Sequence, residues 1–527
     1  MLRIERSAWT LAFSSALLSI LIFPLPNLYV LSWAALAPLL IALVRTQSPK
    51  TLQIEGRRKL LPAPPSEAFF LGYVSGILWY AGTCYWVYNT MKQYGGISAL
   101  GAAGLLILFC LYLGLYHGLF ALVVSLLAKA SVRSALVLSP FVWVAVELAR
   151  TRISGFPWDL LGITQVDNVP LARIAGITGV YGVSFEIMVV NAAFAAAFVA
   201  RQGRRRSMLV AALASAFVLQ SARWIPLPAV PAENTALLVE ENIPVLDPSD
   251  WTPQFFETTL LDLSRISQAA EEHHHPDLIV WPESPAPFYS QDPLFRTALT
   301  QLARSAQAWI VVGMIGTDNT SRLPQSAAEV FNSAALINPQ GQWTERYDKV
   351  HLVPFGEFVP FRRWLAFAGG LTKEVGDFTR GASRRVLRAG DEKLGVFICY
   401  ESIFPDEVRQ FARQGAQVLV NISNDGWYGD SGAYAQHLRQ ARMRALENDR
   451  WLLRSTNTGV TAAIDPWGRI VARAPRKVRT VLAAGYSLNN QTSFYTRYGD
   501  WLAYGCAIIS LGAVLVSVTP SKARQVR

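Results

Sequence analysis

The sequence predicts a polytopic α-helical membrane domain joined to a soluble α/β domain. Of the 527 residues, 52% are hydrophobic and only 16% are charged, whereas a soluble globular chain carries about 25% charged residues. The deficit lies toward the two ends of the chain, because the stretch from about 235 to 495 has ordinary polar content. We therefore expect a membrane domain at 1–224, a soluble domain at 225–495, and a last span with its tail at 496–527.

Eight apolar segments are candidate membrane spans, since a span needs about 20 mostly apolar residues. They are 8–25, 27–44, 67–88, 97–128, 134–149, 177–200, 207–223 and 498–518. The first segment could instead be a signal peptide, because Arg3 and Arg6 precede it. No small-residue cleavage site follows, so we expect a retained helix and eight spans in total.

Basic residues between these segments predict the orientation of the spans. With eight spans, the basic clusters at 3–6, 45–59, 129–133, 201–206 and 522–527 all fall on one side of the membrane. Lys and Arg accumulate on the cytoplasmic side. The pattern therefore predicts cytoplasmic termini and an external soluble domain, with Arg150 and Arg152 as exceptions. Because orientation accounts for the net charge of +11, we expect no nucleic-acid partner.

The predicted soluble domain alternates strand-like and helix-like segments. Short apolar runs predict strands, two longer segments predict helices, and two segments containing Pro and Gly predict hairpin turns. The strands are expected at 235–240, 277–283, 309–316, 334–339, 394–401 and 417–425, the helices at 252–272 and 432–450, and the turns at 337–343 and 464–470.

Several charged residues lie where these predicted strands end. Glu283 ends "LIVWPE", next to Pro282, and a partly desolvated carboxylate there would be a competent base. Lys349 opens the apolar stretch "KVHLVPFGE", in which Glu357 follows. A cation beside a buried site can stabilise a developing oxyanion, although lone lysines are more often solvated.

Cys399 lies at the end of the predicted strand in "GVFICYES". A cysteine there could be a nucleophile, a metal ligand or a small buried hydrophobe. The other three cysteines lie in apolar runs, so the soluble domain has no second thiol for a disulfide. No cysteine spacing is typical of zinc sites, and we expect neither a metal nor a cofactor.

Together, "WPES" with Glu283, "YDKVHLVPFGE" with Lys349 and "CYES" with Cys399 resemble the Glu-Lys-Cys triad of the nitrilase, or carbon–nitrogen hydrolase, superfamily. Further stretches, "SGFPWDLLG", "ENIP", "NISNDGWYG" and "TRYGDW", resemble the bacterial apolipoprotein N-acyltransferase family over nearly the whole chain. One departure is "VEENIP", since family members usually have Gln-Gly before Asn-Ile-Pro.

The resemblance implies a nitrilase-like four-layer αββα sandwich and an acyltransferase of the bacterial inner membrane, with its catalytic domain in the periplasm. It implies acyl transfer from a phospholipid, through a thioester on Cys399, to the α-amine of the N-terminal diacylglyceryl-cysteine of an apolipoprotein. The supporting residues it implies are Glu357, Tyr400, Glu401 and, after the "NIP" motif, Trp251.

Other interpretations remain open. The triad alone fits a membrane-tethered amidase or nitrilase that hydrolyses a small amide. A transporter or receptor is disfavoured because the spans carry few ionisable residues, Glu147 being the main exception. The segment 361–371 is expected to be an interfacial arm over the acyl-binding site, or else a plain surface helix.

Overall fold

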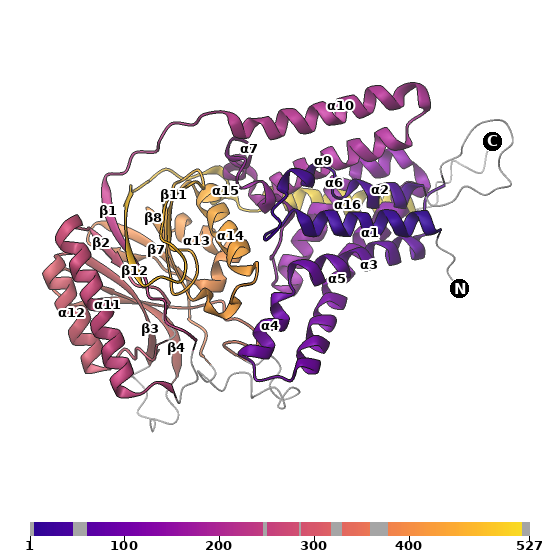
Figure 1. Ribbon diagram of the computed structural model, residues 1–527. Coiled ribbons are helices and arrows are strands. Elements are labelled where there is room, and N and C mark those ends of the chain that lie inside the picture. Colours follow the sequence, from indigo (N-terminus) through magenta and orange to yellow (C-terminus); the bar gives the residue numbers. More distant parts are fainter. Residues whose placement is uncertain are drawn as a thin grey trace. The chain divides into compact units, whose positions relative to one another are not determined.

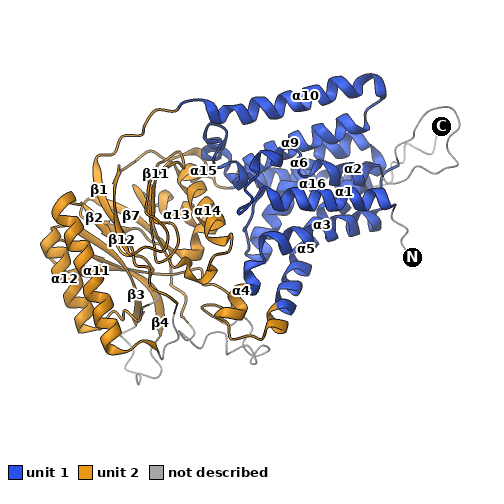
Figure 2. Ribbon diagram, in the orientation of Figure 1, with its two compact units in different colours: residues 1–88, 103–226, 500–527 blue, residues 89–102, 227–499 orange. Residues whose placement is uncertain are grey.

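The computed structural model describes residues 5–45, 61–245, 250–283, 286–317, 329–358 and 378–518. The chain divides into two compact units, coloured separately in Figure 2. Unit 1 comprises 1–88, 103–226 and 500–527, and unit 2 comprises 89–102 and 227–499. Residues 89–102, from the hairpin between two helices of the N-terminal half, thus group with the unit that contains most of the soluble segments.

Unit 1 is helical, and each of the eight predicted apolar segments contains a helix. These are α1 (Arg6–Leu21), η1 and α2 (Tyr29–Trp33 and Ala37–Val44), α3 (Pro65–Thr83), α5 (Ala99–Ala130), α6 (Val132–Ala149), α9 (Val180–Val199), α10 (Gln202–Ser221) and α16 (Trp501–Val518). Shorter elements are α4 (Trp86–Gln93), η3 (Arg150–Ser154), η4 (Leu161–Gln165), α7 (Val169–Ala172), α8 (Ala175–Thr178) and η5 (Ala222–Trp224). Helices α4 and α5 extend across the boundary between the units.

Within the described residues, five helices are long and apolar enough to cross a membrane. They are Ala99–Ala130, Val132–Ser154, Val180–Val199, Gln202–Trp224 and Trp501–Val518. Of the remaining predicted spans, α1 has only 16 residues, and Tyr29–Val44 is a shorter apolar segment. Length and composition therefore support five spans of the eight that the sequence predicts.

Backbone groups in unit 1 are satisfied internally where the helices are interrupted. The side chain of Asn191 on α9 donates to the carbonyl of Ser32 at 2.8 Å and accepts from the N–H groups of Leu36 and Ala37 at 2.8 and 3.0 Å. Asn191 thus pairs with the backbone from the end of η1 to the start of α2. Such pairing is required of any irregular backbone inside a bilayer.

Unit 2 contains two six-stranded mixed sheets. Their strand orders are β12-β1-β2-β3-β4-β5 and β11-β10-β9-β8-β7-β6, with β1–β2–β3 and β7–β8–β9 parallel. The strands are β1 (Asn234–Glu240), β2 (Leu278–Val280), β3 (Trp309–Thr317), β4 (Val330–Ile337), β5 (Trp343–Asp348), β6 (Leu387–Ala389), β7 (Glu392–Ile398), β8 (Val418–Ser423), β9 (Leu452–Thr456), β10 (Ala462–Ile464), β11 (Ile470–Arg473) and β12 (Thr480–Tyr486).

Helices cover the outer face of each sheet. Helices α11 (Pro253–His274) and α12 (Pro293–Ala306) contact the first sheet, and α13 (Pro405–Arg413) and α14 (Ala433–Asn448) contact the second, as the labels in Figure 1 show. The sheets contact each other through β1 and β9. A further helix, α15 (Phe494–Tyr498), packs against α13 and α14. The layers are therefore α-β-β-α, and both predicted helices, all six predicted strands and both predicted hairpins are confirmed.

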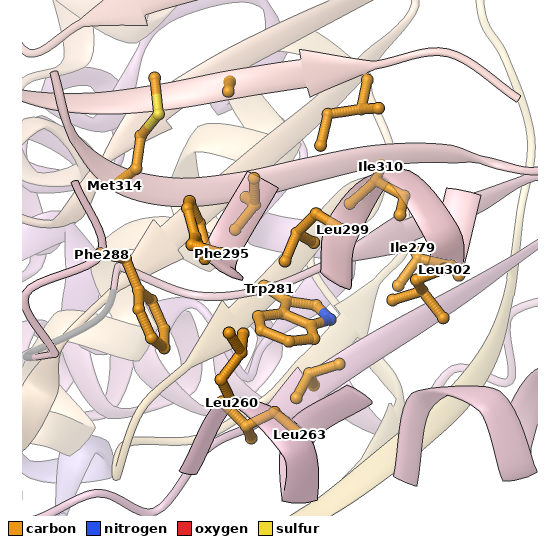
Figure 3. Packing of buried hydrophobic residues seen from close by; sticks show 14 of the residues in the cluster. Leu260, Leu263, Ile279, Trp281, Phe288, Phe295, Leu299, Leu302, Ile310 and Met314 are labelled. Carbon is orange, nitrogen blue, oxygen red and sulfur yellow. The ribbon is translucent and has the colours of Figure 1, made fainter. Parts of the chain in front are cut away.

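An aromatic core fixes the first sheet to its helices (Figure 3). Trp281, which is fully buried just after β2, packs among Phe288, Phe295 and Leu299. Its indole N–H donates to the Ser267 hydroxyl on α11 at 3.2 Å. Burial of such large rings dominates the energetics of a core. The chain segment that carries Glu283, two residues further on, is anchored by this packing.

The Ser455 hydroxyl on β9 connects the two sheets at their centre. Its oxygen lies 2.6 Å from the carbonyl oxygen of Val239 on β1 and 3.0 Å from that of Val280 on β2. The carboxyl ends of the parallel strands β2, β7 and β8 lead into Glu283, Cys399 and Asn424. Ligands of parallel sheets bind beyond such ends, so this edge is where a site is expected.

Gly313 on β3 tests how closely the segment carrying Glu283 must approach the sheet. A Cβ atom at this position would lie 2.3 Å from the Pro282 carbonyl oxygen and 2.8 Å from the Glu283 Cα atom. We expect Gly313→Ala to displace Glu283, because backbone atoms cannot yield as a side-chain tip can. Activity should fall more than the melting temperature does. Gly203→Ala, where nothing lies within 4 Å, is the control and should leave both unchanged. Equal activity in the two variants would contradict the argument.

Candidate active site

Cys399 occupies a strained turn between β7 and α13. It begins the 3-10 turn η9 (Cys399–Ile403), its φ angle is +48°, and its side chain is buried. A non-glycine residue in the left-handed region costs about 1–3 kcal/mol and persists only where the surrounding structure imposes it. The strain fits a functional residue better than a simple filler of core space.

Lys349 lies between two carboxylates. It follows β5, is almost fully buried, and its Nζ is 2.8 Å from Glu357 Oε1 and 3.4 Å from Glu283 Oε1. Burial alone lowers the pKa of the ammonium, but the Glu283 and Glu357 carboxylates outweigh burial and raise the pKa above its usual value. Lys349 therefore stays charged, as a fixed positive centre in the site.

The charges of Glu283 and Lys349 both act on the pKa of the Cys399 thiol. Burial and then the Glu283 carboxylate raise the pKa of this thiol well above its usual range, while Lys349 opposes them. The thiol is therefore protonated at rest. A protonated thiol needs a base to become a nucleophile, and Glu283 is the carboxylate that acts most strongly on the pKa of this thiol. The structure thus brings the three predicted residues together.

Asn332 on β4 is a site residue that the sequence analysis missed. Its Nδ2 donates to Glu283 Oε1 at 2.6 Å and to Glu357 Oε1 at 2.7 Å. Glu283 Oε2 accepts from the backbone N–H of Asn424 at 2.7 Å. Both oxygens of the Glu283 carboxylate are therefore held, and its orientation is fixed before any substrate binds. An asparagine within a run of strand residues gives no sequence signal for this function.

Glu357 is held in the same cluster from a different side. Its Oε2 accepts from the backbone N–H of Val353 at 2.7 Å, while its Oε1 accepts from Lys349 and Asn332. The carboxylate is thus shared between one ammonium, one amide and one backbone donor.

Glu401 connects the two loops that carry Lys349 and Cys399. Its Oε1 accepts from the Tyr347 hydroxyl at 2.8 Å and from the N–H groups of Val350 and His351 at 2.8 and 3.0 Å. Its Oε2 accepts from the Ile398 N–H at 2.8 Å. These contacts come from residues within two positions of Lys349 and from the residue directly before Cys399. Glu401 is therefore placed to hold the cation and the nucleophile in register.

The other predicted supporting residues have different surroundings. Tyr400 is buried, with its ring 5.3 Å from that of Phe404 and 5.8 Å from that of His351. Trp251 packs beside Phe255, with ring centroids 5.0 Å apart, at the edge of the aromatic core. Its described contacts are with this core and not with the triad. The segment 361–371 lies outside the described residues.

No group of three or more His, Cys, Asp or Glu side chains suited to a metal occurs in the parts of the chain that the structure describes. Cys399, Glu283 and Lys349 supply a thiol, a carboxylate and an ammonium. This set can transfer an acyl group through a covalent thioester.

The fold and this constellation define a class. Residues 248–494 match the family described as carbon-nitrogen hydrolase. Residues 15–193 match the family described as apolipoprotein N-acyltransferase N-terminal domain. The chain belongs to the apolipoprotein N-acyltransferase family, and its second half is a carbon-nitrogen hydrolase domain.

Curated relatives cover nearly the whole chain. It is 36% identical over 523 residues to an apolipoprotein N-acyltransferase of Geobacter metallireducens, covering 98% of this chain and 95% of the relative. It is 37% identical over 465 residues to one of Methylococcus capsulatus, covering 85% and 88%. Among solved structures, a mutant of the Nesterenkonia AN1 amidase from the nitrilase superfamily aligns with a TM-score of 0.38 and 18% identity, covering 53% of this chain and 99% of the amidase.

The reactivity of Cys399 should follow the charges around it. We expect slow alkylation by iodoacetamide at neutral pH and an inflection of the rate well above about 8.5, the pKa of a free thiol. Glu283→Gln removes a negative charge that raises the thiol pKa, so the inflection should move to lower pH. Cys399→Ala gives the background from the other cysteines. An inflection that stays in place or rises in Glu283→Gln would contradict this electrostatic account.

Proposed function

We propose that this protein transfers an acyl chain from a phospholipid to the α-amine of the N-terminal diacylglyceryl-cysteine of an apolipoprotein. The observation that carries the proposal is the strained, buried Cys399 beside Glu283 and Lys349. It occurs in a chain that matches apolipoprotein N-acyltransferases over both the helical and the catalytic halves. The acyl chain is carried between the two substrates as a thioester on Cys399.

In the first half-reaction, Glu283 takes the thiol proton as sulfur attacks the ester carbonyl of the phospholipid. The developing oxyanion is stabilised by Lys349 and by the backbone N–H of Tyr400. Collapse of this intermediate breaks the carbonyl carbon–oxygen bond. The proton on Glu283 passes to the departing oxygen, which leaves as a lysophospholipid hydroxyl.

In the second half-reaction, the lipoprotein amine attacks the thioester. Glu283 accepts a proton from the attacking nitrogen, and the same oxyanion donors act again. The carbon–sulfur bond breaks, and Glu283 returns the proton to the Cys399 sulfur. An ester and an amine are thus converted to an amide and a lysophospholipid, with the enzyme unchanged.

The three acids near Cys399 have separate tasks in this scheme. Glu283 moves protons, because among the carboxylates that raise the pKa of the thiol it has the largest effect. Glu357 and Asn332 hold the Lys349 ammonium and the Glu283 carboxylate at fixed positions. Glu401 holds the loops on which Lys349 and Cys399 are carried. Such preorganised charges need no rearrangement when the oxyanion forms.

We propose that the protein resides in the bacterial inner membrane with eight spans, periplasmic catalytic residues and cytoplasmic termini. The basic residues support this orientation, since 201–206 are exposed at the start of α10. A membrane setting also suits substrates that are both lipid-anchored. Thr90 and Tyr94, in the segment that leads into α5, donate to the carbonyls of Trp427 and Gly426, close to Asn424. The loop beside the base is thus tied to a segment continuous with a candidate span.

A transfer assay separates this function from hydrolysis of a small amide. Purified protein in mixed micelles receives phospholipid labelled in its acyl chain and a synthetic diacylglyceryl-cysteine peptide. We expect label on the peptide amine and release of lysophospholipid, with loss of both in Cys399→Ala. Cys506→Ser, which changes a buried cysteine of α16, is the matched control and should retain transfer. Release of free fatty acid without peptide acylation, or hydrolysis of simple amides alone, would refute the proposal.

The proposed orientation is tested with single introduced cysteines. Leu294→Cys lies on α12, where the leucine is 54% exposed, and Ser207→Cys lies in the exposed basic start of α10. The natural cysteines are all buried, which keeps the background low. We expect a membrane-impermeant maleimide to label position 294 in intact spheroplasts and position 207 only after the membrane is opened. The reverse pattern would overturn the orientation.

A further inference from the structure

His437 contacts the turn that begins with Cys399, and it has no part in the proton transfers proposed above. It is fully buried on α14. Its Nε2 is 2.7 Å from the Ser402 hydroxyl oxygen and 3.1 Å from the carbonyl oxygen of Cys399. Both atoms belong to the turn η9 that begins with the nucleophile. One ring nitrogen therefore touches the turn at both of these residues.

The other ring nitrogen of His437 faces a buried carboxylate. Its Nδ1 is 2.9 Å from Asp425 Oδ1, and Asp425 Oδ2 accepts from Arg454 Nη2 at 2.7 Å. Burial raises the pKa of Asp425, but Arg454 and His437 outweigh burial and hold that pKa well below its usual value. Burial lowers the pKa of His437. With the ring proton on Nδ1, the ionised Asp425 accepts from Nδ1–H and Nε2 accepts the Ser402 hydroxyl proton; with the proton on Nε2, the ring donates to the Cys399 carbonyl oxygen.

Asp425 stands directly next to the residue that holds the base. The backbone N–H of Asn424 donates to Glu283 Oε2 at 2.7 Å. A continuous set of contacts therefore runs from the Glu283 carboxylate through Asn424, Asp425 and His437 to the turn of Cys399. Ser423 adds a further donor, with its hydroxyl 2.8 Å from Asp425 Oδ1. The space beside the carboxylate is filled, since a Cβ atom on Gly459 would lie 2.3 Å from Asp425 Oδ2.

We propose that His437 and Asp425 are positioning residues that set the distance between the base Glu283 and the nucleophile Cys399. The inference rests on the proposed acyl transfer through Cys399. Its physical basis is the strained backbone of Cys399, which would relax without external contacts. The ion pair between Asp425 and Arg454 holds His437 rigidly, because the side chains of all three residues are buried and paired.

The effect of losing this support should appear in the rate and not in substrate affinity. A shift of about 1 Å between reacting groups costs about 10²-fold in rate. The phospholipid need not touch His437, so its KM should stay close to the wild-type value. A purely structural histidine would instead change the melting temperature and leave the per-molecule rate of the folded enzyme intact.

Two amide variants separate the two ring nitrogens. His437→Asn keeps a donor near the Nδ1 position toward Asp425 and deletes the contact with Ser402. His437→Gln keeps a polar atom near the Nε2 position. We expect His437→Asn to slow the first-turnover release of lysophospholipid about 10²-fold, and His437→Gln to recover much of the rate. Ser402→Ala should slow it in the same direction.

A double-mutant cycle tests whether His437 and Ser402 act together. The double variant His437→Asn with Ser402→Ala should be no slower than His437→Asn alone, because both changes remove one shared contact. Thr300→Val is the control, since it deletes a hydroxyl on α12 that contacts the Gly341 carbonyl and the Trp343 indole, and none of these residues belongs to the active site. It should lower the melting temperature and leave the first-turnover rate unchanged.

The outcomes distinguish this inference from the proposed function. Wild-type acylation in folded His437→Asn, a loss confined to KM, or independent effects of the two changes would overturn the positioning role. If His437→Asn does not fold, the first-turnover rates and KM values of Ser402→Ala and His437→Gln test the positioning role instead. If the wild-type protein forms no acyl-enzyme, the proposed function fails. The rate of iodoacetamide alkylation of Cys399 then tests the positioning role, which requires a changed rate in His437→Asn and an unchanged rate in Thr300→Val.

Discussion

The catalytic unit depends on one buried ionic cluster, in which the Lys349 ammonium lies between the carboxylates of Glu283 and Glu357. Burying a charge is costly unless it is paired and hydrogen-bonded. Here the charges are matched by additional donors, chiefly the Asn332 amide. The cluster holds a base and a cation at fixed positions beside a thiol that is protonated at rest. The proposed chemistry follows from this arrangement, since in it the sulfur becomes nucleophilic when Glu283 removes its proton.

Two further buried groups keep the nucleophile aligned with that cluster. Glu401 joins the loop after Lys349 to the strand before Cys399 through four hydrogen bonds from Tyr347, Val350, His351 and Ile398. His437, which follows Cys399 in the sequence and pairs with Asp425, contacts the same turn through the Ser402 hydroxyl. A strained φ angle at Cys399 can persist because both sides of its turn are fixed. The same two sheets place these loops together, since the supporting residues follow β5, β7 and β8 or lie on α14.

The sequence predicted residues that a neighbouring motif marks. It did not predict residues whose partners are distant in the sequence. Apolar runs predicted the six strands. Glu283 and Cys399 were visible because each ends or nearly ends a predicted strand, and Lys349 was visible because it opens an apolar stretch. Asn332 and His437 gave no signal, because a lone polar residue in a strand or helix usually faces solvent. Strand β9 was missed because Arg454 interrupts its apolar run. That arginine is fully buried, and Asp425, distant in the sequence, pairs with it there.

The central claim is that the acyl chain passes through the Cys399 sulfur, and mass spectrometry of the protein after exposure to phospholipid alone tests it most directly. Without an acceptor amine, the thioester should accumulate. The account predicts one acyl adduct on the peptide that contains Cys399, cleaved by neutral hydroxylamine and lost when the acceptor peptide is added. An adduct on another residue, or lysophospholipid release from wild-type protein with no adduct at Cys399, would contradict it.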